Sequence, residues 1–399
     1  MSRDVHPSDD LLCFSHLRWN FVYQRPQHLM TRFARDRRVF YVEEAITDAT
    51  EPRLDVDNDG DVTVVVPHLP AELDAALSAR LQQILLGNLL REHQIVHPIL
   101  WYYTPMALEW SRSVQGKAIV FDCMDELSAF ANAPASLLAL EQELLERADV
   151  VFTGGQSLYE AKKDRHPHVF AFPSSVDCAH FLRARSERTE PVDQASIPRP
   201  RVGFFGVIDE RMDRDLLAGL ARLRPDWHQI LIGPVVKIDP ALLPRAGNIH
   251  YLGMKQYADL PAYLAGWDVA YLPFARNDAT RFISPTKTPE YLAAGRPVVS
   301  TSIADVVRPY GECGFVTIAN TPEECARALD RSLAISDGAW LRRVDDYLST
   351  LSWDRTYTAM NHLVNESART TKGCRGSRGE RQLGDSDVRL LDRRSGLRG

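Results

Sequence analysis

The chain alternates short apolar segments with helical patterns along most of its 399 residues. In the first half, the segments that read as strands are 10–15, 38–43, 61–67, 98–103, 118–123, 150–154 and 168–173. Helical patterns lie between them, for example at 27–35, 71–92 and 136–147. Short apolar strands that alternate with helices indicate parallel sheets covered by helices on both faces.

A second series of the same kind begins after the proline-rich stretch 197–201. Its strands read RVGFFGVI, WHQILIG, NIHYLG, DVAYLPF, RPVVST and GFVTI, and helical patterns at 213–222, 257–265, 290–294 and 322–335 alternate with them. A chain of this length is too long for one ordinary core. The pattern therefore predicts an α/β fold of two facing, Rossmann-like, doubly wound domains.

The predicted domain limits follow from these two series. We expect an N-terminal domain over 1–195, a C-terminal domain over 196–350, a helix at 351–366 that returns toward the first domain, and a disordered basic tail over 367–399. Ligands of doubly wound sheets bind beyond the carboxyl ends of the strands. Two such sheets that face each other should place a small-molecule site in the cleft between the domains.

Charge and cysteine content exclude several classes of protein. From Arg369 onward nine Lys/Arg stand against four Asp/Glu, so the tail carries +5 and the rest of the chain −11 of the net −6. An acidic body is a poor nucleic-acid binder. Six scattered cysteines and twelve histidines form no metal-ligand spacing, so we expect no metal site and a reducing cytoplasm.

Membrane association is the remaining question about location. No apolar run approaches the roughly 20 residues of a membrane span, and the N-terminus lacks a signal-peptide pattern. We expect a cytoplasmic protein. Its basic tail could contact the anionic inner face of the cell membrane, where a lipid-linked acceptor would lie.

One segment, 271–300, carries the strongest functional signal. It reads as a strand, a polar loop, a short helix and a second strand, and the helix could begin at Ser284 with Pro285 or at Thr288 with Pro289. Either start puts Lys287 at or just before the first turn, where free N–H groups attract anions. Glu290 follows on the same side of the helix. The pair could bind the diphosphate and ribose of a nucleotide-sugar, although an ordinary solvated helix face is the alternative.

Polar residues also follow the first strand. His16, Arg18 and Trp19 occupy a loop, and Arg25 leads into a helix. An imidazole, two cations and an aromatic plane suit an acceptor sugar or a phosphate. Alternatively, Trp19 packs the loop and the charges are solvated.

Two further strand ends offer candidates. Asp122 at the end of 118–123 could act as a general base on a sugar hydroxyl, whereas Asp125 could start the next helix. Gly203 and Gly206 could form a turn whose backbone approaches a phosphate, and Arg211 could add charge there.

The segment SPTKTPEYLAAGRPVVST resembles the donor site of the group 1 (family 4-like) glycosyltransferases, and NIHYLGMKQYADLPAYLAGWDVAYLPF resembles the region before it. PSSVDCAHF is similar to the family's crossing between domains. FSHLRWNFVYQRPQHL and VFDCMDELSAF resemble a bacterial subgroup associated with cell-surface polysaccharide assembly. This resemblance implies two facing Rossmann-like domains, the GT-B fold.

The resemblance also implies a reaction: transfer of a sugar from a UDP- or GDP-linked donor to an acceptor hydroxyl on a saccharide or lipid-linked molecule, without metal or further cofactor. Cations and helix N–H groups would stabilise the leaving diphosphate. From these positions and the resemblance together, we expect the catalytic residues to be Asp122, His16 and Lys287; the donor-binding residues to be Gly203, Gly206, Arg211, Ser284, Thr286, Lys287 and Glu290; and the acceptor-binding residues to be Arg18, Trp19, Arg25 and Asp125.

One position departs from the family pattern. Eight residues before Glu290 the family has a second glutamate, and this chain has Phe282. The substitution leaves the stereochemical outcome open. A nucleotide-sugar epimerase of the same fold and a binding protein without turnover remain alternative interpretations.

Overall fold

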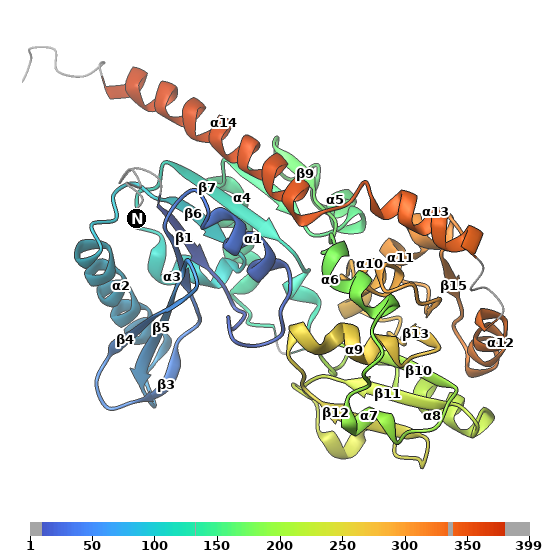
Figure 1. Ribbon diagram of the computed structural model, residues 1–399. Coiled ribbons are helices and arrows are strands. Elements are labelled where there is room, and N and C mark those ends of the chain that lie inside the picture. The colour runs from blue at the N-terminus through green and yellow to red at the C-terminus, as the bar shows by residue number, and fades with distance from the viewer. Residues whose placement is uncertain (1–9, 132, 334–337, 380–399) are drawn as a thin grey trace, which may run out of the picture.

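The computed structural model describes residues 10–131, 133–333 and 338–379, which form two α/β domains joined side by side (Figure 1). In the described part of the first domain, nine strands form one sheet in the order β3-β5-β2-β1-β6-β7-β8-β9, with β4 paired to β5. These strands are β1 (Leu11–Phe14), β2 (Val39–Val42), β3 (Ile46–Ala49), β4 (Arg53–Asp59), β5 (Val62–Pro70), β6 (Ile99–Tyr102), β7 (Ala118–Cys123), β8 (Val150–Thr153) and β9 (Val169–Ala171).

Helices cover both faces of this sheet. They are α1 (Arg25–Phe33), α2 (Ala75–Glu92), η1 (Pro105–Ala107), α3 (Leu108–Ser111), η2 (Leu127–Ala129), α4 (Leu137–Arg147) and α5 (Gln156–Lys162). Along β1, Leu11 and Cys13 pack into one apolar cluster, and Leu12 and Phe14 pack into the other. Because alternate residues of a strand face opposite sides, the central strand is apolar throughout.

The second domain has a parallel sheet of six strands in its described part, in the order β12-β11-β10-β13-β14-β15. They are β10 (Arg201–Phe205), β11 (His228–Ile232), β12 (Ile249–Gly253), β13 (Val269–Leu272), β14 (Val298–Ser300) and β15 (Val316–Ile318). The strand order reverses beside β10, the kind of switch point where doubly wound sheets bind ligands. The predicted α/β fold class is confirmed.

The surrounding helices complete one large apolar core. They are α6 (Cys178–Leu182), η3 (Arg183–Arg185), α7 (Val192–Ala195), α8 (Arg214–Leu223), η4 (Pro240–Leu242), η5 (Tyr257–Asp259), α9 (Leu260–Ala265), η6 (Asp278–Thr280), α10 (Lys287–Ala293), α11 (Ala304–Val306), η7 (Val307–Gly311), α12 (Pro322–Ser332) and α13 (Gly338–Leu348).

The chain passes between the domains earlier than residue 195, the boundary expected from the sequence. Val176, Phe181 and Ala184 already pack into the core of the second domain. The expected boundary relied on the proline-rich stretch, but that stretch lies within the second domain, directly before β10.

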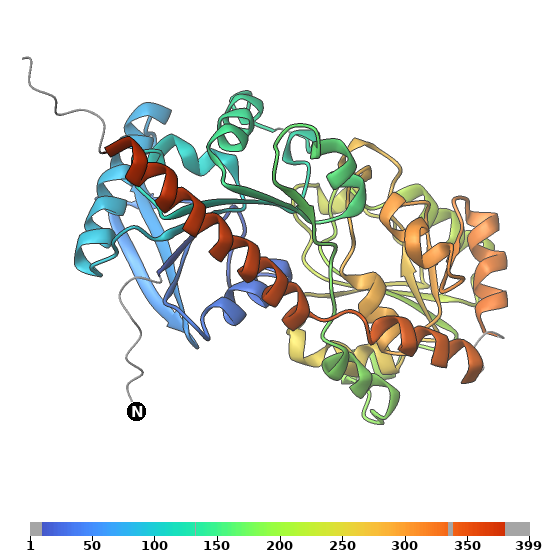
Figure 2. The same cartoon turned by 90° about the horizontal axis from the view of Figure 1, so that it is seen from above.

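The last helix, α14 (Trp353–Gly379), returns across the first domain (Figure 2). Trp353, Met360 and Val364 are fully buried in that domain's core. The helix runs to Gly379, so residues 367–379 are helical, whereas the sequence predicted disorder from 367 onward. The rest of the predicted tail, 380–399, lies outside the described residues.

Two strands, β3 and β4, were not predicted. Strand β4 reads RLDVDND and is mostly exposed, so it lacks the apolar pattern of a core strand. It pairs antiparallel with β5 along its whole length. This pairing places Asp59 at the end of β4, close to the cleft.

Hydrogen bonds and a ring stack hold the domains together. Ser174 Oγ donates to the backbone oxygen of Ser284 at 2.6 Å. The Ala131 N–H donates to Glu210 Oε1 at 3.1 Å. The ring of Tyr23 stacks on that of Tyr257, with centroids 4.5 Å apart. The structure therefore shows the domains in contact across the cleft.

Candidate active site

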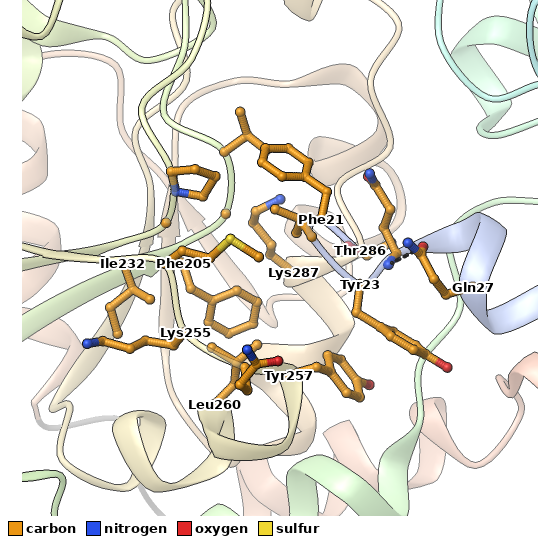
Figure 3. Close-up of a pocket in the computed structure, with 18 of the residues that line it drawn as sticks. Phe21, Tyr23, Gln27, Phe205, Ile232, Lys255, Tyr257, Leu260, Thr286 and Lys287 are labelled. Atoms are coloured by element: carbon orange, nitrogen blue, oxygen red, sulfur yellow. Dashed lines mark hydrogen bonds between the residues drawn. The ribbon is translucent and has the colours of Figure 1, made fainter. Parts of the chain in front are cut away.

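A cavity of about 460 Å³ lies between the two domains (Figure 3). From the first domain, the loop 19–24, Gln27 and Asp59 line it. From the second domain it is lined by 205–207, 232–234, 254–257, Leu260 and the start of α10. Three of these segments follow or end strands β10, β11 and β12, so the cavity occupies the place expected of a ligand site in a doubly wound sheet.

Helix α10 begins at Lys287, and Thr286 is its N-cap. Neither predicted start, Ser284 or Thr288, is the cap, but both placed Lys287 in or next to the first turn. Lys287 and Glu290 both line the cavity, so the three-residue spacing brings them to one side of the helix, as predicted.

The side chains of Lys287 and Glu290 have no direct hydrogen-bond or ion-pair partner among the described residues. Burial lowers the pKa of Lys287, with Arg211 adding to the effect. Burial raises the pKa of Glu290, and Lys287 opposes that rise. Charged groups held this way are costly unless a ligand pairs with them, which makes this turn a candidate binding element.

Gly206 lets the β10 loop lie against Lys287. Its φ is +141°, and a Cβ there would lie 2.0 Å from Lys287 Cε. The neighbouring loop approaches as closely, since a Cβ at Gly233 would lie 1.8 Å from the Gly206 oxygen. Both glycines line the cavity. A backbone without side chains here leaves room for a phosphate beside the lysine.

A smaller cavity of about 80 Å³ adjoins the first and shares Gln24, Val207, Arg211, Thr286 and Lys287 with it. Arg25, Asp125 and Ser284 also line it. Arg211 is fixed by bonds to both oxygens of Asp209, and its guanidinium lies 5.5 Å from the Phe130 ring centroid. The two cavities thus form one cleft, with a cation-rich centre at Lys287 and Arg211.

Comparison with known proteins shows what the second domain is similar to. Residues 199–334 match the family model described as glycosyl transferases group 1.

TuaH of Bacillus subtilis (strain 168), which is named as a teichuronic acid biosynthesis glycosyltransferase, is 23% identical over 233 residues. That alignment covers 53% of this chain and 58% of TuaH, so it spans less than two thirds of that relative.

Solved structures share the fold. Sucrose-phosphate synthase from Thermosynechococcus elongatus has a TM-score of 0.68 at 15% identity, covering 90% of this chain and 98% of that one. HepE from Anabaena, in complex with UDP and glucose, has a TM-score of 0.63 at 13% identity, covering 89% and 99%. These similarities show that the chain has the GT-B fold.

Most of the predicted donor residues meet in the cleft. Gly206, Arg211, Thr286, Lys287 and Glu290 line the larger cavity, and Ser284 lines the smaller one. Gly203 does not. It lies inside β10, where a Cβ would come within 2.0 Å of the Trp267 ring, so its role is core packing and the predicted turn role is wrong.

Asp122 does not fit the predicted role of base. It is fully buried at the end of β7, and Arg25 binds it through Nη2 at 2.8 Å and through Nε. Arg25 also donates to the Phe172 oxygen at 2.7 Å. This ion pair occupies both side chains and closes Asp122 off from an acceptor. Arg25, predicted to bind the acceptor, borders the smaller cavity, and each of its three side-chain nitrogens already donates a hydrogen bond within the first domain.

Asp125 is better placed for proton transfer. It is half-buried and lines the smaller cavity with Lys287. Burial raises the pKa of Asp125; Arg211 opposes the rise and Asp209 adds to it. A carboxylate with a raised pKa that faces a cleft is suited to accept a proton.

Trp19 and Arg18, in the loop after β1, make different contacts. Trp19 lines the larger cavity and donates from Nε1 to Asp59 Oδ2 at 2.6 Å. Arg18 instead binds Glu43 at 2.8 Å and the Glu44 oxygen at 2.6 Å, so it fixes the loop. Trp19 therefore borders the cavity and Arg18 does not, and an acceptor contact of Trp19 stays a prediction.

His16 lies outside both cavities. Burial lowers its pKa to about 4, with Lys237 adding to the effect, and its Nδ1 is buried without a partner among the described residues. The imidazole is therefore neutral near pH 7 and retains one unused ring nitrogen.

Phe282 turns away from the cleft. Its half-buried ring packs against an apolar cluster of the first domain, and the Arg281 guanidinium lies 5.0 Å from its centroid. No carboxylate takes its place among the described lining residues of this segment. The position therefore contributes to contact between the domains.

Sequence analysis missed several lining residues: Asp59, Tyr23, Tyr257, Lys255 and Gln256. The last three come soon after β12 and could have been found from the strand-end rule. Asp59 could not, because its strand was not predicted.

Proposed function

We propose that the protein is a group 1 glycosyltransferase that moves a sugar from a UDP- or GDP-linked donor to a hydroxyl of a saccharide or lipid-linked acceptor, in the assembly of a cell-surface polysaccharide. The observation that carries the proposal is the unpaired Lys287 and Glu290 on one turn of α10, inside the cavity at the strand ends. The HepE structure with UDP and glucose favours uridine over guanosine.

The reaction follows from the charges in the cleft. As the bond between the sugar and the diphosphate breaks, negative charge grows on the leaving diphosphate. Lys287 and Arg211 lie where they can stabilise that charge, next to the Gly206 backbone. Stabilising groups that are already in position need no rearrangement during the reaction, so they act on the transition state.

Glu290 would accept hydrogen bonds from the ribose diol. On the acceptor side, Asp125 would take the proton of the attacking hydroxyl as its oxygen bonds to the sugar carbon, and Trp19 would pack against the acceptor or donor sugar. Asp125 takes the place of Asp122 as the proposed base because Asp122 is buried in an ion pair with Arg25, whereas Asp125 lines the smaller cavity. No metal has a role in it.

The test is a turnover assay with UDP-glucose, UDP-galactose and GDP-mannose, each with a panel of saccharide and lipid-linked acceptors. Release of the nucleoside diphosphate that requires an acceptor, and persists in EDTA, supports the proposal. Sugar isomerisation with donor alone would indicate an epimerase. Tight nucleotide binding without turnover across the panel would favour a binding protein, which the loss of a glutamate at Phe282 makes the second candidate.

We also propose weak contact with an anionic membrane. No helix in the described ranges is long and apolar enough to span a bilayer. The sequence of the last turns of α14 has Arg369, Lys372, Arg375 and Arg378 without an acidic residue, whereas the acidic residues of the tail lie in 380–399. Basic groups near anionic lipid contribute about 1 kcal/mol each before screening.

Two truncations test this contact. Removing 380–399 should leave co-sedimentation with phosphatidylglycerol vesicles at low salt almost unchanged, and removing 369–399 should reduce it. Equal sedimentation of both truncations and the full chain would contradict the proposal.

A further inference from the structure

A second cavity between the domains, of about 200 Å³, opens on the side of the Ser174–Ser284 contact away from Lys287. Both cavities border Ser174 and Ser284, and the hydrogen bond between these residues forms part of the wall that separates them. We call it the hinge cavity. Phe172 and Ser175 line it from the crossing segment, Asp305 and Tyr310 from the second domain, and Arg355 from α14.

Two arginines give the hinge cavity a positive rim. Arg308 is exposed and makes no hydrogen bond within the described part of the chain. Its φ of −109° and ψ of 120° are extended and interrupt the helical turns around it. A residue before proline favours this conformation. The Arg355 side chain donates one hydrogen bond, from Nη1 to the Thr350 oxygen at 3.1 Å. Its other guanidinium N–H groups have no hydrogen-bond partner among the described residues.

The interior has unsatisfied polar atoms. Ser175 is 3% exposed and Asp305 6% exposed, and Ser175 Oγ and Asp305 Oδ2 have no hydrogen-bond partner among the described residues. A buried polar atom without a partner costs free energy that a ligand hydroxyl can recover. Phe172, Tyr310 and Tyr347 supply aromatic surface for the apolar face of a ring.

We propose that the hinge cavity binds a phosphorylated monosaccharide. Its volume is less than half the 460 Å³ of the donor cavity, which favours a ligand of one ring over a nucleotide. The arginines would bind the phosphate, and Ser175 with Asp305 would bind ring hydroxyls. Such a ligand touches the crossing segment, the second domain and α14 at once, so its binding favours the domain arrangement seen here.

The experiment measures binding of glucose 6-phosphate by calorimetry to the full chain, with UDP at saturation to fill the donor cavity. Arg308→Gln combined with Arg355→Gln should weaken binding roughly tenfold or more, as expected for loss of charge-assisted contacts. Ser175→Ala should weaken it less. Arg331→Gln, an exposed arginine on α12, and Lys287→Ala, in the donor site, should leave it unchanged.

Three outcomes would overturn the proposal. They are equal affinity of the double arginine variant and the wild type, competition between UDP and glucose 6-phosphate, and affinity for inorganic phosphate equal to that for glucose 6-phosphate. Because the readout is binding with the donor cavity filled, it does not depend on the proposed transfer reaction.

Discussion

Asp305 of the second domain accepts a hydrogen bond from the backbone N–H of Ser157 in the first domain, at 2.9 Å. Ser157 is the second residue of α5, whose own N-cap is Gly155 and has no side chain to offer. A Cβ at Gly155 would lie 2.1 Å from Asp305 Oδ2. A carboxylate from one domain therefore caps a helix of the other.

Asp305→Ala should loosen contact between the domains. An N-cap contributes about 0.5–2 kcal/mol, and here that free energy depends on the domains being together. We expect a larger radius of gyration by small-angle scattering and a lower kcat. Asp213→Ala is the matched control, since Asp213 caps α8 within its own domain. If both variants show the scattering curve of the wild type, Asp305 does not hold the domains together.

Lys287→Ala should remove most transfer activity and leave the fold intact. A hydrogen bond to a charged group contributes about 1.5–3 kcal/mol, which corresponds to a loss of roughly tenfold to a hundredfold or more. Acceptor-dependent UDP release measures it. Lys163→Ala, which removes a surface lysine paired with Glu160, should behave as wild type. Normal turnover in a folded Lys287→Ala protein would remove Lys287 from the mechanism.

Glu290→Gln should weaken UDP binding, because charged hydrogen bonds to the ribose become neutral ones of about half the strength. It should also change the pH dependence. The Glu290 carboxylate raises the pKa of Lys287, so its loss lowers that pKa. Transfer needs protonated Lys287. The pH above which activity is lost should therefore be lower in the variant than in the wild type. An unchanged Kd and an unchanged alkaline limb would contradict the assignment.

Asp125→Asn should lower transfer activity, whereas Asp122→Asn should lower the stability of the fold. Asp125→Asn should keep UDP binding and the unfolding midpoint while transfer falls roughly 100-fold or more. Asp122→Asn leaves Arg25 buried without its charge partner, and breaking such a pair costs about 3–5 kcal/mol of stability. Denaturant unfolding and turnover of both variants separate a base from a structural pair. Full activity in folded Asp125→Asn would contradict the proposed base.

The pH profile of the wild type tests the same residue. A base must be ionised, so activity falls as pH drops through its pKa. Burial raises the pKa of Asp125, and the acid limb of kcat/KM should therefore lie above the value of about 3.9 for an exposed aspartate. The limb should be absent from the residual activity of Asp125→Asn.

The sequence predicted those features that depend on local pattern. Apolar runs located the core strands because a buried parallel strand is apolar on both faces, and the spacing from Lys287 to Glu290 put both on one side of α10. It failed where contacts in the folded protein decide the outcome. Arg25 turns Asp122 into a structural residue, and Trp267 turns Gly203 into a packing residue; both partners lie far away in sequence. The segment Arg53–Asp59 is a strand because it pairs with the neighbouring β5, although its own residues lack the apolar pattern of a strand.

Helix α14 has a consequence for how the chain folds during synthesis. Trp353, Met360 and Val364 belong to the core of the first domain but leave the ribosome after the whole of the second. Until then one face of the first sheet is exposed, and only contacts of long sequence separation can cover it. We expect the second domain to become resistant to protease first. The N-terminal half expressed alone should then aggregate unless residues 353–364 are supplied as a separate peptide.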